Sequence, residues 1–315
     1  MRKTILSVLG FTLSFLAAAQ DPHFSQYFSN PVYLNPDFVG YNGCPTIHTS
    51  YRNQWPNISG NFQTANISYD MMLGKRHGIG VNYQYDNAAN TILSHSFDLI
   101  YAPAFRMINK QVMISPSLEF GWHYRSMNID KLSFGEMIDP RYGTGIAYPW
   151  QSGVYNTERH FMDISTGLLV TWNGMVAGFA AHHVTQPDEG FSGFSKLPVK
   201  LTGHINYQFK ITERIKISPA FIYVNQQDFH SILPSISFEA YGARLGVATR
   251  TSLSNPDAVI FMLGYRGHGV KVGYSYDLTV SSLSNSTGGS HEVSLAYVFN
   301  CKKSEYKKGV PLINF

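Results

Sequence analysis

The chain has little charge, only two cysteines and no long apolar run beyond its start. Charged side chains make up 14% of its 315 residues, against about 25% in typical soluble domains. Two cysteines are too few for a disulfide-built small domain or for a zinc site of the paired-cysteine type. After residue 19, no segment approaches the roughly 18 apolar residues that a spanning helix needs. Phosphate-binding loops and nucleic-acid signatures are also absent, so these classes are excluded.

The first 19 residues have the pattern of a secretory signal peptide. Met1-Arg2-Lys3 is cationic, residues 4–16 are mostly apolar, and Ala17-Ala18-Ala19 offers small residues for cleavage. We therefore expect an exported protein whose mature chain begins near Gln20. No cysteine stands at the cleavage point, which argues against a lipoprotein anchor. If the mature chain enters a membrane, it must do so as a β-barrel.

Aromatic residues are abundant and alternate with polar ones. The 20 Tyr and 21 Phe contribute to an aromatic content of 14%. In residues 79–86, the side chains Ile79, Val81, Tyr83 and Tyr85 alternate with polar or small residues, which puts the two kinds on opposite faces of a strand. A soluble β-sandwich alternates too, but the export signal, the low charge and the aromatics near strand ends favour a membrane barrel.

The fold class that we predict is all-β: a single-chain transmembrane outer-membrane β-barrel of about fourteen antiparallel strands, with short periplasmic turns and long extracellular loops. The expected strands are 46–53, 62–73, 79–86, 95–106, 111–124, 161–172, 175–183, 199–209, 215–224, 229–239, 242–250, 258–265, 270–277 and 292–299.

Loop lengths give the strand count an independent test. The long links 125–160, 184–198 and 278–291 all follow odd-numbered strands, as they should if both ends of the barrel are periplasmic. The expected organisation is a signal peptide (1–19), a periplasmic aromatic leader (20–43), the barrel (44–301) and a C-terminal periplasmic tail (302–315).

The two cysteines flank the expected barrel. Cys44 precedes the first strand and Cys301 follows the last, and closure of an even-stranded barrel puts those strands side by side. We predict a disulfide, which would stabilise the closure seam by roughly 4 to 5 kcal/mol. Two unrelated free thiols are the alternative, because a disulfide needs Cα atoms within about 7 Å.

Catalytic and metal sites are not expected, and neither are cofactors. His182 and His183 should point to opposite faces, without a carboxylate at ligand spacing. A barrel hydrolase would need a serine and a histidine on adjacent strands with an orienting acid. The sets Ser94-His95-Ser96 and Ser290-His291-Glu292 are expected by coincidence in a chain with this many serines.

Two further regions are left with open interpretations. The loop 125–160 carries Tyr142, Tyr148 and Trp150, which suit either anchors for a protein partner outside or a constriction folded into the pore. Charged side chains at inward strand positions are expected mainly to pair with each other inside the lumen. They are Asp70, Asp86, Asp98, Arg106, Glu119, Arg125, Lys200, Glu239 and Lys271.

The segment after the signal peptide carries a family resemblance. It reads Asp-Pro-His-Phe-Ser-Gln-Tyr-Phe-Ser-Asn-Pro-Val-Tyr-Leu-Asn-Pro-Asp-Phe-Val-Gly over residues 21–40, with two Asn-Pro breaks that fit neither a regular strand nor a long helix. It resembles the leader of the PorP/SprF family, outer-membrane components of the type IX secretion and gliding machinery of Bacteroidota. Ser-Tyr-Arg-Asn-Gln-Trp-Pro (50–56), Asn-Ile-Ser-Tyr-Asp (66–70), Val-Gly-Tyr-Ser-Tyr-Asp-Leu-Thr (272–279) and Gly-Ser-His-Glu-Val (289–293) resemble family blocks at both barrel ends. Residues 127–185 add little to the match.

The resemblance implies a non-enzymatic protein of the cell outer membrane that serves type IX secretion. Its implied partners are periplasmic, peptidoglycan-linked secretion components, or a secreted adhesin-like surface protein with a type IX C-terminal signal domain, which the barrel helps to export or holds at the surface. A passive porin is the alternative function. For the leader, we expect its aromatics either to plug the barrel base or to dock a periplasmic partner. These aromatics are Phe24, Tyr27, Phe28, Tyr33 and Phe38.

Overall fold

The structure is a computed structural model of the chain. It describes residues 21–74, 76–103, 105–107, 112–132, 138–139, 143–144, 157–252, 255–280 and 287–300. The expected signal peptide (1–19) and C-terminal tail (302–315) lie outside these ranges. No helix within the described ranges is both long and apolar enough to span a membrane.

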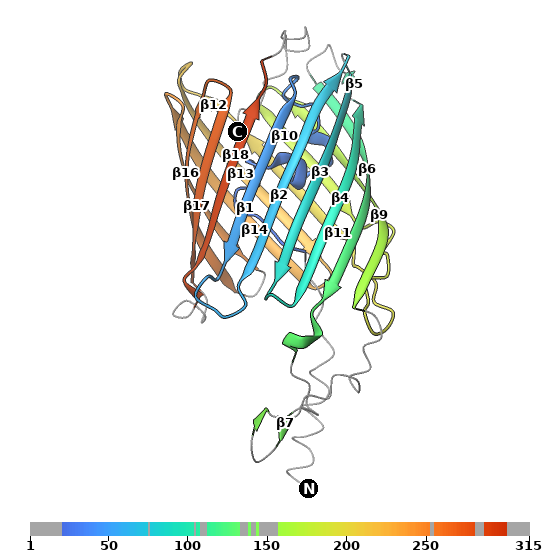
Figure 1. Cartoon of the computed structure of the whole chain (residues 1–315). Coiled ribbons are helices and arrows are strands. Elements are labelled where there is room, and N and C mark those ends of the chain that lie inside the picture. The colour runs from blue at the N-terminus through green and yellow to red at the C-terminus, as the bar shows by residue number, and fades with distance from the viewer. Residues whose placement is uncertain are drawn as a thin grey trace.

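Antiparallel strands form a closed barrel (Figure 1). Fourteen strands make the wall, where β5 (Phe105–Met107) continues β4 and β12 (Phe209–Lys210) continues β11. The wall strands are β1 (Thr46–Gln54), β2 (Phe62–Leu73), β3 (His77–Ala88), β4 (Ile92–Pro103), β6 (Val112–Met127), β9 (Glu158–Trp172), β10 (Met175–His182), β11 (Lys200–Tyr207), β13 (Ile215–Gln226), β14 (Phe229–Ala240), β15 (Ala243–Thr251), β16 (Pro256–Gly267), β17 (Val270–Thr279) and β18 (Ser290–Val298).

The remaining elements are not part of the wall. They are α2 (Pro31–Leu34) and the 3-10 turn η1 (Pro36–Phe38) in the leader, η2 (Ile129–Lys131) after β6, and the two-stranded pair β7 (Ile138–Asp139) and β8 (Gly143–Thr144). All fourteen expected strands are confirmed, with bounds that differ by no more than three residues.

The first and last strands close the barrel. β1 pairs with β18 in antiparallel register, with Thr46 opposite Val298, and the amide of Phe299 donates to the carbonyl of Pro45 at 2.9 Å. The barrel therefore begins and ends at one rim, which also carries the short links after β2, β9, β14 and β16 and is called here the short-turn rim. The opposite long-loop rim carries the links after β6, β10 and β17, so the predicted parity is confirmed.

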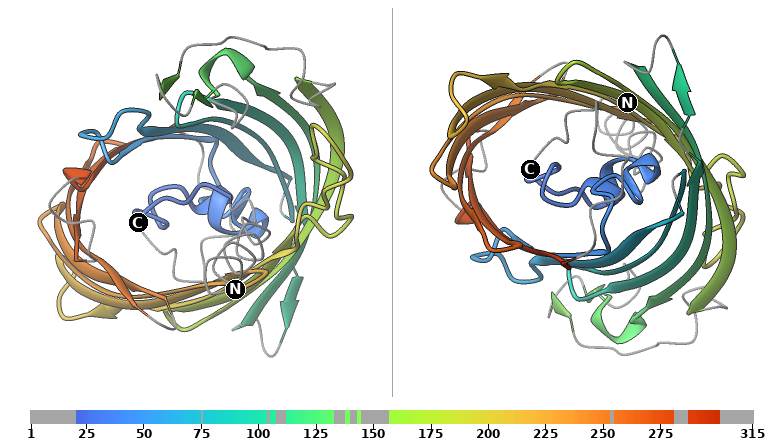
Figure 2. Two further views of the ribbon diagram at one scale, coloured as in Figure 1. Left: turned by 90° about the horizontal axis from the view of Figure 1, so that it is seen from below. Right: turned by 90° about the horizontal axis from the view of Figure 1, so that it is seen from above.

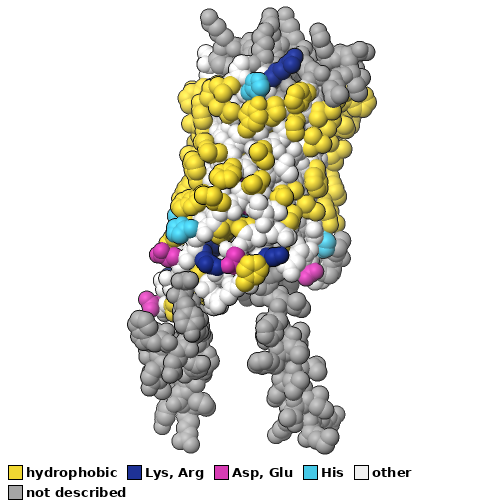
Figure 3. Space-filling view, turned by 90° about the vertical axis from the view of Figure 1, so that its right-hand side faces the viewer, with side chains coloured by type: hydrophobic (Ala, Val, Ile, Leu, Met, Phe, Trp, Pro, Cys, Tyr) yellow, Lys and Arg dark blue, Asp and Glu magenta, His cyan; other side chains and the backbone are white. Residues whose placement is uncertain are grey.

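The wall is apolar outside and polar inside. Along β2, Thr64, Asn66 and Asp70 are buried on the lumen side, while Ile67 and Tyr69 face outward and are 48% and 36% exposed. A broad band of hydrophobic side chains covers the outer surface, and charged side chains gather toward its ends (Figure 3). An exposed apolar band of this kind is what a lipid-facing wall requires.

The leader lies inside this barrel, as views along its axis show (Figure 2). Phe24, Leu34 and Phe38 are almost completely buried there. The barrel interior therefore holds a packed polypeptide segment as well as the polar side chains of the wall.

An arginine in the lipid-facing band should destabilise the barrel according to its depth. Leu99, midway along β4, is 51% exposed, and Ile211, at the short-turn rim, is 59% exposed. We expect Leu99→Arg to lower the free energy of unfolding in lipid vesicles by about 2 to 4 kcal/mol and Ile211→Arg by about 0 to 1 kcal/mol. Urea titration followed by tryptophan fluorescence measures both, and equal effects would contradict the assigned membrane face.

Candidate functional site

The leader runs through the lumen from one rim to the other. Asp21 contacts His183, Lys200 and Gln226, which stand where β10, β11 and β13 meet the long-loop rim. Gly40 contacts Asp70, near the short-turn end of β2. The expectation that the leader lies at the periplasmic mouth is wrong in position, because polar wall groups along the whole lumen bind it. The structure thus places the leader inside the lumen, and its role as a plug or as a docking segment stays a prediction.

Two Asn-Pro steps fold the leader into a compact segment. Pro31 begins α2 and Pro36 begins η1, each at the first helical position, where the lack of an amide proton costs nothing. The side chain of Asn35 also caps η1, since its Oδ1 accepts a hydrogen bond from the amide of Asp37 at 3.0 Å. These breaks shorten the chain so that it fits across a lumen rather than extending as a strand.

Ser25 binds an ionic network at the long-loop end. Its amide donates to Glu292 Oε2 at 2.6 Å and its hydroxyl donates to Asp277 Oδ2 at 2.6 Å. Arg52 lies 2.9 Å from Asp277 and 3.4 Å from Glu292, and Arg250 lies 2.9 Å from Asp277. Arg52 and Glu292 are each 1% exposed. The network joins β1, β15, β17 and β18 to the leader, and buried charges of this kind are tolerated only when they are paired.

Amides bind the middle of the leader. Asn30 Nδ2 donates to Asn66 Oδ1 at 2.6 Å, and the chain continues from Asn66 to Asn82 and from Asn82 to Asp98, each at 2.9 Å. On the other side, Asn35 Nδ2 lies 3.2 Å from His204 Nε2. The leader is thus bound to two parts of the barrel wall, β2–β4 and β11.

Glycines let the leader backbone touch the wall near the short-turn rim. A Cβ added at Gly78 would lie 2.2 Å from the carbonyl oxygen of Val39, and one at Gly80 would lie 2.6 Å from Val39 Cγ1. Gly40 has φ of +72° and donates its amide to Asp70 Oδ2 at 2.9 Å. Gly203 on β11, in contrast, faces open space. Larger side chains at 78 or 80 would collide with the leader.

Apolar contacts complete the packing. Tyr27, Leu34 and Phe38 belong to one buried cluster with wall residues of six strands. Val32 and Val39 pack on Ile100 and Ala102 in another. The wall members of the first cluster are Leu169, Val176, Ile222, Val224, Leu233, Ala248 and Ile260. These apolar inward positions are exceptions to the outward-apolar pattern, and the leader covers them.

The predicted partner-binding aromatics of the leader are packed in the lumen. Phe24, Tyr27 and Phe38 are 0%, 4% and 2% exposed, while Phe28 and Tyr33 are partly buried. Phe24 and Tyr33 form an edge-on pair with ring centroids 5.0 Å apart, and Lys200 lies over the Tyr33 ring. Tyr142, Tyr148 and Trp150, together with Cys301, lie outside the described residues.

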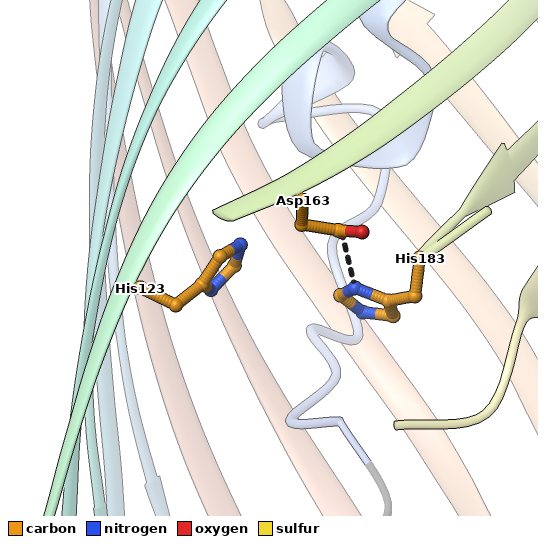
Figure 4. Close-up of side chains that lie close together, drawn as sticks. All are labelled: His123, Asp163 and His183. Atoms are coloured by element: carbon orange, nitrogen blue, oxygen red, sulfur yellow. Dashed lines mark hydrogen bonds and ion pairs between the residues drawn. The ribbon is translucent and has the colours of Figure 1, made fainter. Parts of the chain in front are cut away.

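Asp21 and a histidine form the leader's outermost contact. His183 Nε2 lies 2.8 Å from Asp21 Oδ2. The other ring nitrogen, Nδ1, lies 2.6 Å from Asp163 Oδ2 (Figure 4). Lys200 lies 3.2 Å from the same oxygen of Asp21.

The prediction that His182 and His183 lack carboxylate neighbours is wrong. His182 Nδ1 lies 3.6 Å from Glu119, and both rings are buried. The reason is local: β10 ends at His182, and His183 has φ of +59°, so strict alternation stops between them. Carboxylates distant in sequence reach the rings across strands, where spacing along the chain gives no indication of them.

The two serine–histidine sets do not converge. His95 lies 2.8 Å from the hydroxyl of Tyr83, and His291 lies 2.8 Å from the hydroxyl of Tyr274, both among exposed groups of the outer face. Ser290 and Glu292 face the lumen instead. Alternation thus separates each histidine from its sequence neighbours.

The expected pairing of lumen charges holds only in part. Glu239 lies 3.4 Å from Lys216 and 2.6 Å from Arg266, so these groups pair across the wall. Lys200, in contrast, pairs with Asp21 of the leader, and Asp70 lies between the leader amide of Gly40 and His48 of β1, which is 3.4 Å away. Sequence reasoning missed the polar leader residues Asp21, Ser25, Asn30 and Asn35, although they recur every four or five positions between its aromatics.

These features define a class: a transmembrane β-barrel whose lumen holds its own N-terminal leader. Among solved structures, the chain is similar to the toluene transporter TbuX of Ralstonia pickettii, with a TM-score of 0.50 and 11% identity over 86% of this chain and 94% of that one. It also matches the outer membrane protein Omp33 of Acinetobacter baumannii (0.46, 8%, 81% and 98%) and the toluene transporter TodX of P. putida (0.48, 10%, 85% and 93%). No curated protein matches the chain.

A family model described as the type IX secretion system membrane protein PorP/SprF matches residues 16–297. The chain therefore belongs to the PorP/SprF family, as its leader and barrel blocks indicate. It is an outer-membrane component of the type IX secretion system.

Loss of Arg52 should loosen the leader. Arg52→Gln leaves Asp277 and Glu292 buried with one cation fewer, so we expect the free energy of unfolding to fall by about 3 to 5 kcal/mol. Limited proteolysis should then cut within residues 21–40 of the folded barrel. Arg159→Gln is the matched control, because its pair with Asp188 is partly exposed and worth about 0 to 1 kcal/mol. Equal protection of the leader in both variants would refute its dependence on this network.

Proposed function

We propose that this protein is a non-enzymatic component of type IX secretion whose leader keeps the barrel closed while its long-loop rim assists export or surface attachment of a secreted adhesin-like protein. The observation that supports this most is the rim-to-rim course of the leader, which binds both walls and covers the apolar part of the lumen. A passive porin needs an open, water-filled path, and a packed leader opposes one.

The secreted partner would bind at the long-loop rim. Tyr142, Tyr148 and Trp150 remain the proposed anchors, and the described loop between β10 and β11 adds Phe194, which is 73% exposed. Large aromatic side chains at such positions are typical binding anchors. Gliding motility would follow from surface attachment of an adhesin.

Periplasmic, peptidoglycan-linked components of the machinery would bind at the short-turn rim, where the barrel begins and ends. The buried leader aromatics Phe24, Tyr27 and Phe38 would contact such a partner only after the leader leaves the lumen. The leader is therefore proposed to act first as a plug, and any binding by its aromatics would be coupled to opening.

Removal of the leader should open the barrel and stop secretion. We expect deletion of residues 21–39 to leave a folded barrel, to raise its conductance in planar bilayers by several-fold, and to abolish export of the cargo in cells. Gly78→Ala should have a smaller effect of the same kind, because the new Cβ collides with Val39. Gly203→Ala, where space is open, is the control.

The opposite results are informative. Steady conductance of the intact protein, together with normal secretion in a knockout strain, would favour the passive porin. Normal export by the leader deletion would contradict the role of the leader in secretion. Lipase and protease assays should give no activity.

A disulfide between Cys44 and Cys301 is also proposed. Pairing of the seam continues beyond β1 to Pro45 and beyond β18 to Phe299, which brings the chain ends together next to Cys44. We expect tryptic mass spectrometry of unreduced protein to find the two cysteine peptides linked, and reduction to separate them. Alkylated free thiols at both positions would rule the bond out.

A further inference from the structure

Three side chains converge at the long-loop end of the lumen, beside the outermost leader contact. His123 on β6, Asp163 on β9 and His183 after β10 each offer one ligand atom, and these atoms all lie within 4.8 Å of one another (Figure 4). They come from neighbouring strands, since β6 pairs with β9 and β9 with β10. The wall itself therefore fixes the three positions.

The donor atoms are those that a transition metal prefers. Two imidazoles and a carboxylate are a familiar three-ligand set for Zn²⁺, with the fourth position left for another ligand or water. Ring contacts with Phe161 and His183 orient His123, and among the described residues its nitrogens make no hydrogen bond. The imidazole of His123 is thus available to bind an ion together with Asp163 and His183.

The leader provides an outer-shell contact to the cluster. Asp21 Oδ2 lies 2.8 Å from His183 Nε2, on the side of the ring away from Asp163. Carboxylates thus flank His183 on both sides: Asp163 belongs to the three-ligand cluster, and Asp21 orients the ring from the opposite nitrogen. Thr185 donates to the other oxygen of Asp163 at 2.7 Å, an outer-shell contact that orients this carboxylate.

Space and unpaired donors adjoin the cluster. A cavity of about 340 Å³ is lined by Asp21, His123, Asp163, His182 and His183, among others. The buried His182 Nε2 has no hydrogen-bond partner among the described residues. The cavity is wide enough for an ion with bound water, and its polar lining suits both.

We propose that His123, Asp163 and His183 bind a divalent transition-metal ion of the Zn²⁺ class with water in the fourth position, and that Asp21 orients the His183 ring from its other nitrogen. Zinc bonds of about 2.0 to 2.2 Å place tetrahedral ligand atoms roughly 3.4 Å apart. Ligand atoms that lie up to 4.8 Å apart therefore approach by about 1.4 Å at most on binding, and the 2.6 Å contact of Asp163 with His183 opens by about 0.8 Å. The ion is linked to Asp21, the first described residue of the leader, through the His183 ring, and so helps to hold the leader in the lumen.

The test uses the full mature protein in detergent, stripped with a chelator and titrated with ZnCl₂. We expect one Zn²⁺ per chain by elemental analysis and a micromolar or tighter Kd from competition with a chromogenic chelator. Co²⁺ substitution should give the intense visible absorption of a tetrahedral site in the unmutated protein. His123→Gln and Asp163→Asn should each weaken Zn²⁺ binding at least tenfold, and Asp21→Asn should weaken it less.

Two controls make the result decisive. His291→Gln, on the outer face, should bind Zn²⁺ as the wild type does, and heat-modified mobility on gels reports whether each variant still forms a barrel. Zn²⁺ should also slow proteolysis of the leader in the wild type but not in His123→Gln. Absence of stoichiometric binding, or equal affinity of His123→Gln and wild type, would overturn the proposal.

Discussion

The need to pair polar groups inside a closed wall is the constraint on which the rest of the structure depends. A lipid-facing barrel alternates apolar and polar side chains, so the outward face that fits the bilayer leaves charges and amides pointing inward. Arg52, Asp277 and Glu292 are almost fully buried there and pair with one another and with Ser25. The leader therefore supplies hydrogen-bond partners that the buried charges of the wall need.

The leader differs in chemistry along its length. Its first part contacts charged wall side chains through Asp21 and Ser25. Its later part packs apolar side chains and approaches the backbone of β3 at Gly78 and Gly80. Contacts to charged groups are weakened by competing charges and ions. Close apolar packing is lost only when the packed segment itself moves. A ligand at the long-loop rim would thus act on the ionic end, and a ligand at the short-turn rim on the packed end.

Much of the fold follows from the sequence, because alternating apolar and polar residues predict strands with one face toward lipid and the other toward the lumen. All fourteen strands, their parity and the seam between β1 and β18 could be predicted in this way. The leader's position could not, because its Asn-Pro steps define local turns but not what they touch. Asn30 meets Asn66, and His183 meets Asp21, across separations that no local pattern encodes.

Cross-linking in living cells tests the central claim most directly. With Cys44 and Cys301 replaced by serine, the pair Asn30→Cys and Asn66→Cys joins positions whose side chains are 2.6 Å apart in the lumen. The matched pair Asn30→Cys and Ile67→Cys differs by one residue along β2, and Ile67 faces outward. The account predicts oxidative cross-linking of the first pair and none of the second. Failure of the first pair to cross-link in a folded barrel would contradict a leader packed in the lumen.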